Sequence, residues 1–319
     1  MKKLVLIGVL FVAAVLGWAT QVNVTLKSDT NVMVYGPIDH YLAPNDPGWG
    51  TSKYAAVVAW PHPLWPYIAN SAAVWISDSY MITGDPVNDS WRKFEATLKI
   101  PCVAYNVGVG SATVNSDNAE EVYLNGVLIG SDGNVQGPIG GYEWYTERYY
   151  PLLNLAAGLN KLEFIVRNYA GDPDDVDNPT GLIFQVTGLT YEIPEVVWRP
   201  PIINKKFVLQ NGSTLPIKFS LYLQDGTQVT GIKNVELRVY KGTCNELTEP
   251  PVATWYLGEG VNNLRSDPNG LHYIANFHTR NYSLEVGAMY SAVVFDGCTQ
   301  EPLGCISFLL SRKGNRSNK

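Results

Sequence analysis

The chain has 319 residues, with 23 Lys and Arg against 29 Asp and Glu, and therefore a formal net charge of −6 at pH 7. An acidic chain is a poor partner for nucleic acid, because that affinity comes from basic side chains that neutralise phosphates. The 19 Tyr, 9 Trp, 29 Gly and 20 Pro favour strands and turns. The length exceeds that of one typical domain, so we expect two hydrophobic cores.

Residues 1–19 have the pattern of a secretory signal peptide. Lys2 and Lys3 precede an apolar run over 4–16. Small residues then occupy the −3 and −1 positions of a cleavage site after Ala19. The run is shorter than the ~20 apolar residues that cross a bilayer, and no later stretch reaches that length. We therefore expect an exported, extracellular or cell-surface chain with no membrane span, and with a net charge of −8 once Lys2 and Lys3 are removed.

An aromatic run follows over 55–77, where Trp60, Trp65, Trp75 and Tyr67 stand among three prolines. One interpretation makes Trp60, Trp65 and Tyr67 a stacking surface for a sugar ring. The other makes the aromatics interior packing, since each removes roughly 150–250 Å² of surface from water. The three prolines favour an irregular crossing segment rather than a regular strand. Trp65 and Trp75 are in positions where they could fill the base of a β-sandwich. We therefore expect packing.

Strand patterns continue to residue 193. Apolar and polar residues alternate over 93–102, which is typical of a half-buried strand. Asn125 and Gly126 suit the positive φ angles of a tight turn, so 122–124 and 127–129 are expected to form a hairpin. Further strands are expected over 160–168, with Leu162, Phe164 and Val166 facing inward, and over 181–193.

A proline-rich segment divides the chain. Pro194, Pro200 and Pro201 cannot belong to a central strand, so 194–202 is expected to link a first domain, 20–193, to a second one. Strand patterns resume beyond it over 215–226, 234–242, 271–279, 290–297 and 305–311. They predict an immunoglobulin-like sandwich over 203–311, followed by a basic disordered tail, 312–319.

Two resemblances add to this pattern. Residues 54–193 resemble a secreted prokaryotic module related to galactose-binding-like jelly rolls. The matching pieces, in order, are "AWPHPLW", "AAVWIS", "SDNAEEVYLNGVLIG" and "LAAGLNKLEFIVRN". The second domain, from "FVLQNGSTLPIKFSL" to "CISFLL", resembles the G-S-T-x-P-x-K-F modules of bacterial and archaeal surface proteins. Those modules are immunoglobulin-like and imply no catalysis. The expected fold is all-β, with two β-sandwich domains after a cleaved signal peptide.

Catalytic motifs do not emerge from the sequence. The chain has no G-x-S-x-G elbow, no H-E-x-x-H and no phosphate-binding glycine loop. Its histidines are scattered, at His40, His62, His272 and His278. We therefore expect that the protein is not an enzyme.

The candidate ligand platform lies in the segment Gly137–Tyr150. Its glycines indicate a mobile loop, and the loop carries Tyr142, Trp144 and Tyr145 between two strands. Aromatic rings of this kind can stack on sugars, so these three residues are the predicted ligand-binding set. Cover for the core is an equally good interpretation of the same residues.

A second candidate site lies in the acidic segment 170–181. Calcium takes six to eight oxygen ligands in a flexible geometry. Galactose-binding-like sandwiches often carry a structural calcium, so the resemblance favours one here, although the spacing is not that of an EF-hand. The alternative is a solvated acidic turn. The predicted ligands are Asp172, Asp174, Asp175, Asp177 and the Asn178 amide.

The four cysteines allow several pairings. Cys102 continues the apolar phase of its strand, which favours a buried free thiol. Cys298 and Cys305 flank a six-residue loop, so a Cys298–Cys305 disulfide is predicted. The alternative joins Cys244 to either of them. A bridge that contains Cys102 would contradict the division into two domains.

The function expected from these features is that of an exported, non-catalytic surface protein. It acts in adhesion or binding, with polysaccharide or a cell-surface glycan as the first ligand class. The alternative is a structural subunit of an extracellular filament or surface layer. In that case the segment 20–36 would lend a strand to a neighbouring copy. Otherwise the same segment pairs within its own domain.

Overall fold

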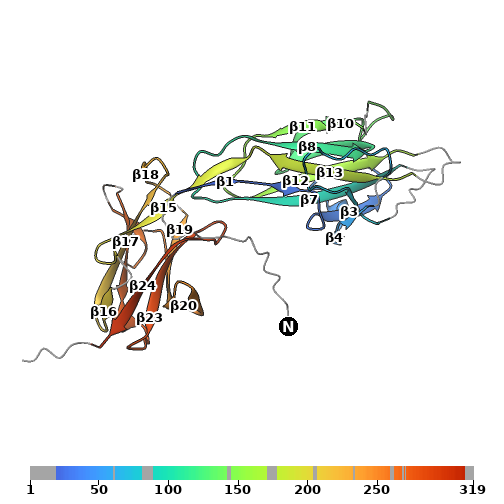
Figure 1. Ribbon diagram of the computed structural model, residues 1–319. Coiled ribbons are helices and arrows are strands. Elements are labelled where there is room, and N and C mark those ends of the chain that lie inside the picture. Colours follow the sequence, from blue (N-terminus) through green and yellow to red (C-terminus); the bar gives the residue numbers. More distant parts are fainter. Residues whose placement is uncertain are drawn as a thin grey trace, which may run out of the picture. The chain divides into compact units, whose positions relative to one another are not determined.

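The computed structural model describes residues 19–59, 62–80, 89–141, 145–170, 178–203, 207–232, 234–258, 262–267, 269 and 271–312. These residues are nearly all β, as the sequence predicted (Figure 1). Helical structure in this part of the chain is confined to two 3-10 turns, η1 (Pro47–Trp49) and η2 (Thr279–Asn281). Within the same ranges, no helix has the length and apolarity needed to cross a bilayer. The expected signal peptide lies outside the described residues except for Ala19.

The chain divides into two compact units. The N-terminal unit comprises 21–192 together with Asp296–Gln300, and the C-terminal unit comprises 193–295 and the chain from 301, with Ala19 and Thr20. The expected linker is wrong in its central part, because Glu195–Arg199 forms strand β15 and pairs with the C-terminal unit. The prolines flank these residues, so every ladder position in between keeps its N–H donor.

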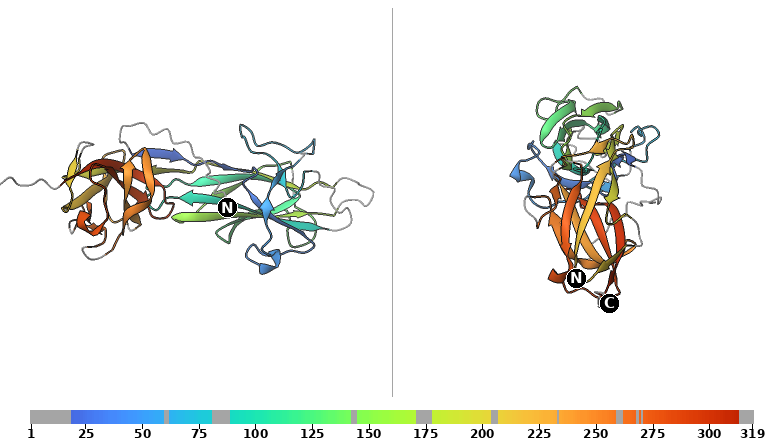
Figure 2. Two further views of the ribbon diagram at one scale, coloured as in Figure 1. Left: turned by 90° about the horizontal axis from the view of Figure 1, so that it is seen from below. Right: turned by 90° about the vertical axis from the view of Figure 1, so that its left-hand side faces the viewer.

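Two large sheets form most of the described N-terminal unit (Figures 1 and 2). Sheet I has the order β10 (Val127–Asp132), β9 (Ala119–Leu124), β12 (Gly158–Asn168), β7 (Ser90–Ile100), β3 (Met33–Ile38) and β4 (Tyr54–Ala55). Sheet II has the order β11 (Arg148–Leu152), β8 (Gly110–Asp117), β13 (Gly181–Thr187), β6 (Ile76–Ser77) and β5 (Val57–Val58), with β2 (Leu26–Lys27) also on β13.

The core of this unit lies between the two sheets. The rings of Phe164 on β12 and Phe184 on β13 meet at 4.5 Å between centroids. The alternation predicted for 93–102 is confirmed along β7, where Phe94 and Leu98 are buried while Lys99 is exposed. The predicted hairpin is confirmed as well. Asn125 and Gly126 have φ angles of 53° and 78°, and Val127 pairs with Leu124.

The aromatic run packs against the outer face of sheet II. Trp65 and Trp75 are buried, their rings lie 4.3 Å apart, and they cluster with Ile183 of β13. Ile183 precedes the core-facing Phe184, so it points to the opposite side of the sheet. The packing interpretation is therefore confirmed for both tryptophans. Tyr67 is 60% exposed, and Trp60 lies outside the described residues.

The segment 20–36 pairs with its own chain. Strand β1 (Thr20–Asn23) pairs with β14 (Thr190–Ile193). Strand β2 then pairs with β13, and β3 pairs with β7. Its strands thus pair within the chain. This is the alternative in which the segment is not lent to a neighbouring copy.

The C-terminal unit is also a two-sheet sandwich, and Ile217, Phe219 and Leu221 are buried as their alternation predicted. Phe277 of β22 packs against two rings of the opposite sheet, Trp255 of β20 at 5.9 Å and Phe308 of β24 at 6.3 Å. Sheet III has the order β15 (Glu195–Arg199), β17 (Thr214–Tyr222), β22 (Tyr273–His278) and β21 (Arg265–Ser266), with β18 (Gln228–Val229) also on β17. Sheet IV has the order β16 (Val208–Gln210), β24 (Pro302–Ser311), β23 (Met289–Asp296), β19 (Val235–Thr243) and β20 (Glu246–Tyr256).

The predicted Cys298–Cys305 disulfide is wrong, and so is the predicted free thiol at Cys102. The structure joins Cys102 to Cys298 and Cys244 to Cys305. In the register of β23 and β24, Cys305 lies opposite Val293 on the ladder, and Cys298 lies in the turn beyond β23. The pairing of Cys244 with Cys305 is one of the alternatives that the sequence left open.

Cys102 lies beyond the end of β7, so the alternation of that strand does not govern its side chain. Its partner belongs to the loop Asp296–Gln300, which groups with the N-terminal unit. Asp296 is fully buried there, and its Oδ2 accepts a hydrogen bond of 2.9 Å from the Val103 N–H. A division of the chain into two uninterrupted domains is therefore wrong at this loop.

Candidate functional site

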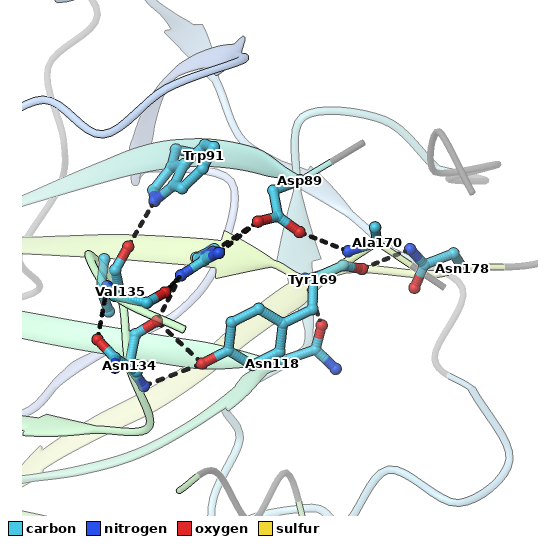
Figure 3. Close-up of polar contacts among 10 residues, drawn as sticks. Asp89, Trp91, Asn118, Asn134, Val135, Tyr169, Ala170 and Asn178 are labelled. Carbon is cyan, nitrogen blue, oxygen red and sulfur yellow. Dashed lines mark hydrogen bonds and ion pairs between the residues drawn. The ribbon is translucent and has the colours of Figure 1, made fainter. Parts of the chain in front are cut away.

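The candidate site lies at the end of the N-terminal unit where three segments meet. One segment leads into β7 at Asp89, a second is the turn 133–137 after β10, and the third leaves β12 at Ala170. The described residues of all three segments are joined by one polar network (Figure 3). The predicted ligand and calcium residues belong to the loops that continue from these segments.

Arg167 on β12 is the centre of the network. It is only 6% exposed, and its Nε and Nη2 both donate to Oδ2 of Asp89. Its Nη1 donates to the carbonyl oxygens of Asn134, at 2.8 Å, and Gly137, at 2.6 Å. Its guanidinium therefore holds the turn 133–137 against the segment that enters β7.

Two aromatic rings enclose the Arg167 guanidinium. The centroid of Trp91 lies 4.9 Å from its central carbon, and that of Tyr169 lies 4.7 Å away. Such cation–π contacts contribute roughly 0.5–2 kcal/mol each, more where water is excluded. The Asp89 carboxylate and these two rings therefore stabilise the buried cation in place of water.

The turn 133–137 has its own set of hydrogen bonds. Trp91 Nε1 donates to the Val135 carbonyl at 2.9 Å. The Tyr169 hydroxyl donates to the Asn134 carbonyl and accepts from the Asn134 N–H, both at 2.9 Å. Asn134 Oδ1 accepts from the Gly137 N–H at 2.7 Å. The start of the predicted ligand loop is thus fixed by side chains of β7 and of the end of β12.

Asp89 ties the third segment to the same centre. Its Oδ1 accepts a 2.6 Å hydrogen bond from the Ala170 N–H, while its Oδ2 is paired with Arg167. All three guanidinium nitrogens of Arg167 and both oxygens of Asp89 are therefore engaged within the protein. The network positions loops, and its charged groups are not offered to a ligand.

The structure places one member of the predicted ligand-binding set. Tyr145 is 61% exposed, after the fixed turn and shortly before β11 begins at Arg148. Tyr142 and Trp144 lie outside the described residues. Tyr145 is therefore largely exposed, in the loop that follows the turn held by Arg167 and Tyr169.

Of the predicted calcium ligands, only Asn178 is described. Its Nδ2 donates to the Tyr169 carbonyl at 2.8 Å, and its carbonyl accepts from Asn168 Nδ2 at 3.2 Å. Asn168 is 1% exposed, and its Oδ1 has no hydrogen-bond partner among the residues that the structure describes. One buried oxygen of calcium-ligand chemistry thus lies at the base of the acidic loop. Asp172, Asp174, Asp175 and Asp177 lie outside the described residues.

Two buried carboxyl groups elsewhere in the unit have raised pKa values. Burial raises the pKa of Asp117 to about 7, although Trp65 Nε1 and Asn118 donate hydrogen bonds to it. Burial likewise raises the pKa of Glu120 to about 7, against hydrogen bonds from Ser116 and Tyr150. Both groups are buried, so their protonation is linked to the stability of the unit.

Sequence reasoning missed Arg167, Asp89, Trp91 and Tyr169. Arg167 lies in the phase of its strand opposite to the inward-facing Leu162, Phe164 and Val166, and the structure covers that face too. A signal was present, because the large apolar Ile165 shares this phase and is fully buried. The outer face of sheet I carries a cluster of Tyr35, Trp49, Trp91, Ala119, Tyr123, Val135, Ile165 and Tyr169.

No protein-family model and no curated protein matches this chain. Among solved structures it is similar to a Bifidobacterium dentium β-glucuronidase, with 14% identity, 91% of this chain and 48% of that chain covered, and a TM-score of 0.32. A Faecalibacterium prausnitzii β-glucuronidase matches with 12% identity, 94% and 47% coverage, and a TM-score of 0.33. A Ruminococcus gnavus β-glucuronidase matches with 12% identity, 91% of this chain and 44% of that chain covered, and a TM-score of 0.28. The chain spans less than half of each enzyme, and likeness at this level carries no argument about function.

Proposed function

We propose that the protein is an exported, non-catalytic binding protein that recognises polysaccharide through loops at one end of its N-terminal β-sandwich. The observation that carries this proposal is the network around Arg167, which fixes the base of the loop that bears the exposed Tyr145. Binding residues commonly lie on loops that a rigid scaffold positions. Exposed aromatic rings provide flat apolar faces on which the C–H face of a sugar can stack.

The disulfides support the proposed location outside the cytoplasm. All four cysteines are paired, as Cys102–Cys298 and Cys244–Cys305. Disulfides of this structural kind persist in oxidising compartments and are rare in reducing ones. This agrees with the signal-peptide pattern at 1–19. Adhesion to a glycan-bearing surface is the role that follows from such a location.

A structural calcium ion at the acidic loop is part of the proposal. The loop supplies four aspartates within 172–177, and the buried Oδ1 of Asn168 adds a carbonyl-type oxygen at its base. An ion bound there would join the acidic segment to the residues that Asp89 and Asn178 already hold together, Ala170 and Tyr169. Assembly through a lent N-terminal strand is not proposed, since 20–36 pairs within its own chain.

A panel of soluble and insoluble polysaccharides tests the proposed function. The chain from Thr20 onward is incubated with each polysaccharide, and binding is scored by affinity electrophoresis and by depletion from the supernatant. The proposal predicts retardation by at least one polysaccharide and unchanged sugar chain length after prolonged incubation. Absence of binding across the panel would contradict it, and release of shortened sugars would overturn its non-catalytic part.

A further inference from the structure

A pocket of ≈ 510 Å³ lies along β15, the edge strand of sheet III. All of its lining residues belong to the C-terminal unit. Most of them come from β15, from the end of β17 and from the turn that follows β17. The lining is completed by Ala19, the residue before the expected cleavage site. The pocket therefore joins the start of the exported chain to the first strand of the C-terminal unit.

Ala19 is held in this pocket by the pairing of β1. It is only 5% exposed, and β1 begins at the next residue, Thr20. Val24, directly after β1, donates its N–H at 2.9 Å to the carbonyl of Leu189, directly before β14. The two strands therefore run antiparallel, and Thr20 lies beside the end of β14.

Glu195 is the unusual group of the pocket, and it comes two residues after the end of β14. Its side chain is half-buried. Among the residues that the structure describes, its carboxylate has no ion pair and no hydrogen bond. Burial alone raises the pKa of this carboxyl group. A carboxylate withdrawn from water without a partner is unfavourable, so a cation beside it would be stabilising.

The basic side chain of the pocket is engaged elsewhere. Arg199 Nε donates to Ser220 Oγ at 3.0 Å, and its Nη2 donates to the Tyr222 hydroxyl at 2.7 Å. Arg199 follows Glu195 by four residues on β15, roughly 13 Å along the strand. Tyr222 lies opposite Glu195 on the neighbouring strand, but its hydroxyl is turned to Arg199. The side chains that line the pocket thus leave Glu195 unpaired.

Cleavage after Ala19 changes this pocket in two ways. Hydrolysis of the Ala19–Thr20 peptide bond consumes one water molecule and leaves a carboxylate on Ala19 and an ammonium group on Thr20. Ala19 departs with the signal peptide, which opens its place in the pocket. We propose that the α-ammonium group of Thr20 then pairs with Glu195, so that the pocket is the binding site of the mature amino terminus. This proposal rests on the expected cleavage site and is independent of polysaccharide binding.

Melting curves of two forms of the chain test the pair. One form starts at Thr20, and the other carries Gly-Ser-Gly-Ser before Ala19, which moves the ammonium group away from Thr20. In the first form, Glu195→Gln should lower the melting temperature of the C-terminal unit by about 1–3 °C, as expected for a partly exposed ion pair. In the extended form it should leave that temperature unchanged or raise it, because it then removes an unpaired, half-buried carboxylate.

The effect should also depend on pH. An α-amino group has a pKa of about 7.7–8.0 when it is exposed, and pairing with a carboxylate raises that pKa. The stabilisation by Glu195 should therefore be complete below about pH 7 and should be lost as the pH rises through the folded pKa, above about 8. The control is Asp225→Asn, in the turn that borders the pocket, where Asp225 Oδ1 accepts from the Thr227 N–H at 2.8 Å. It should change both forms equally.

Amino-terminal sequencing of the exported protein checks the cleavage site itself. Thr20 as the first residue, with a Glu195→Gln effect confined to the form that starts there, supports the proposal. A different first residue would overturn it, and so would an equal effect of Glu195→Gln in the two forms. An effect that persists after the amino group has lost its proton would overturn it too, because Glu195 then acts without the ammonium group.

Discussion

Arg167 is paired with Asp89, a residue that lies 78 positions earlier in the chain. Both side chains are largely withdrawn from solvent, with 7% and 22% of their surface exposed. The pair joins the strand that precedes the acidic loop to the segment that enters β7. Through its other donors, Arg167 also fixes the turn before the predicted ligand loop. The Arg167–Asp89 pair therefore sets the relative positions of the three segments at Asp89, 133–137 and Ala170.

Removing one partner of this pair should destabilise the N-terminal unit strongly. Asp89→Asn leaves the buried guanidinium without its counter-ion, which costs about 3–5 kcal/mol in comparable buried pairs. The double variant Asp89→Asn with Arg167→Met should recover part of that loss, because no unpaired charge remains. Urea unfolding followed by tryptophan fluorescence measures both.

A surface ion pair provides the matched control. Lys241 and Glu285 are paired, but their side chains are 45% and 66% exposed. Glu285→Gln should therefore leave the unfolding midpoint unchanged, since exposed pairs contribute little. If Asp89→Asn were as harmless as Glu285→Gln, the central role of Arg167 would be wrong.

The disulfide pattern can be tested directly by peptide mapping. Digestion of the non-reduced protein should give one peptide pair that contains Cys102 and Cys298 and another that contains Cys244 and Cys305. Replacing Cys102 and Cys298 together by Ala should lower the free energy of unfolding by about 2–4 kcal/mol, because the bond closes a long loop. A peptide pair of Cys298 and Cys305 would contradict the structure.

Stability should fall as the pH rises from about 4 to 7. The pKa values of Asp117 and Glu120 are about 7 in the folded state, against 3.8 and 4.5 without burial. Below pH 4 both groups are protonated in either state, so their full contribution to stability is present. Between pH 4 and 7 the unfolded state ionises first, and the loss is complete above the folded pKa, at roughly 3–4 kcal/mol for each group.

Single variants isolate these two groups from all others that titrate. Asp117→Asn and Glu120→Gln should each flatten the dependence of the melting temperature on pH. Glu246→Gln, at an exposed position on β20, should leave the profile as it is. A profile that neither buried variant changes would show that these carboxyls are not held protonated.

Calcium should raise the melting temperature of the N-terminal unit. After removal of bound metal by a chelator, millimolar calcium is added and unfolding is followed by calorimetry. An ion bound only by the folded state stabilises it in proportion to the logarithm of its concentration over the dissociation constant. The double variant Asp174→Ala with Asp177→Ala should abolish this rise. A wild-type protein that does not respond to calcium would end the proposal of a metal site.

Local patterns predicted the strands well because their physical causes are local. The alternation along 93–102 and the Asn125–Gly126 turn depend on the pleat of a strand and on φ angles. Both are confirmed. Strand β15 was missed because prolines on both sides of Glu195–Arg199 resembled a linker.

Long-range relationships were beyond the reach of these patterns. Cys102 and Cys298 are 196 residues apart, and nothing in either neighbourhood indicates the other. Arg167 was missed because a strand pattern does not reveal that other segments cover the outer face of the sheet.

The affinity of matched tyrosine variants for a polysaccharide tests the central claim most directly. Tyr145 and Tyr67 are 61% and 60% exposed, but only Tyr145 lies on the loop held by the Arg167 network. Isothermal titration with a polysaccharide found in the panel should show binding about tenfold weaker for Tyr145→Ala, because a lost stacking contact is worth roughly 0.5–1.5 kcal/mol beyond the buried area. Tyr67→Ala should bind like the wild type. Equal affinities for all three proteins, or a loss confined to Tyr67→Ala, would contradict the proposed site.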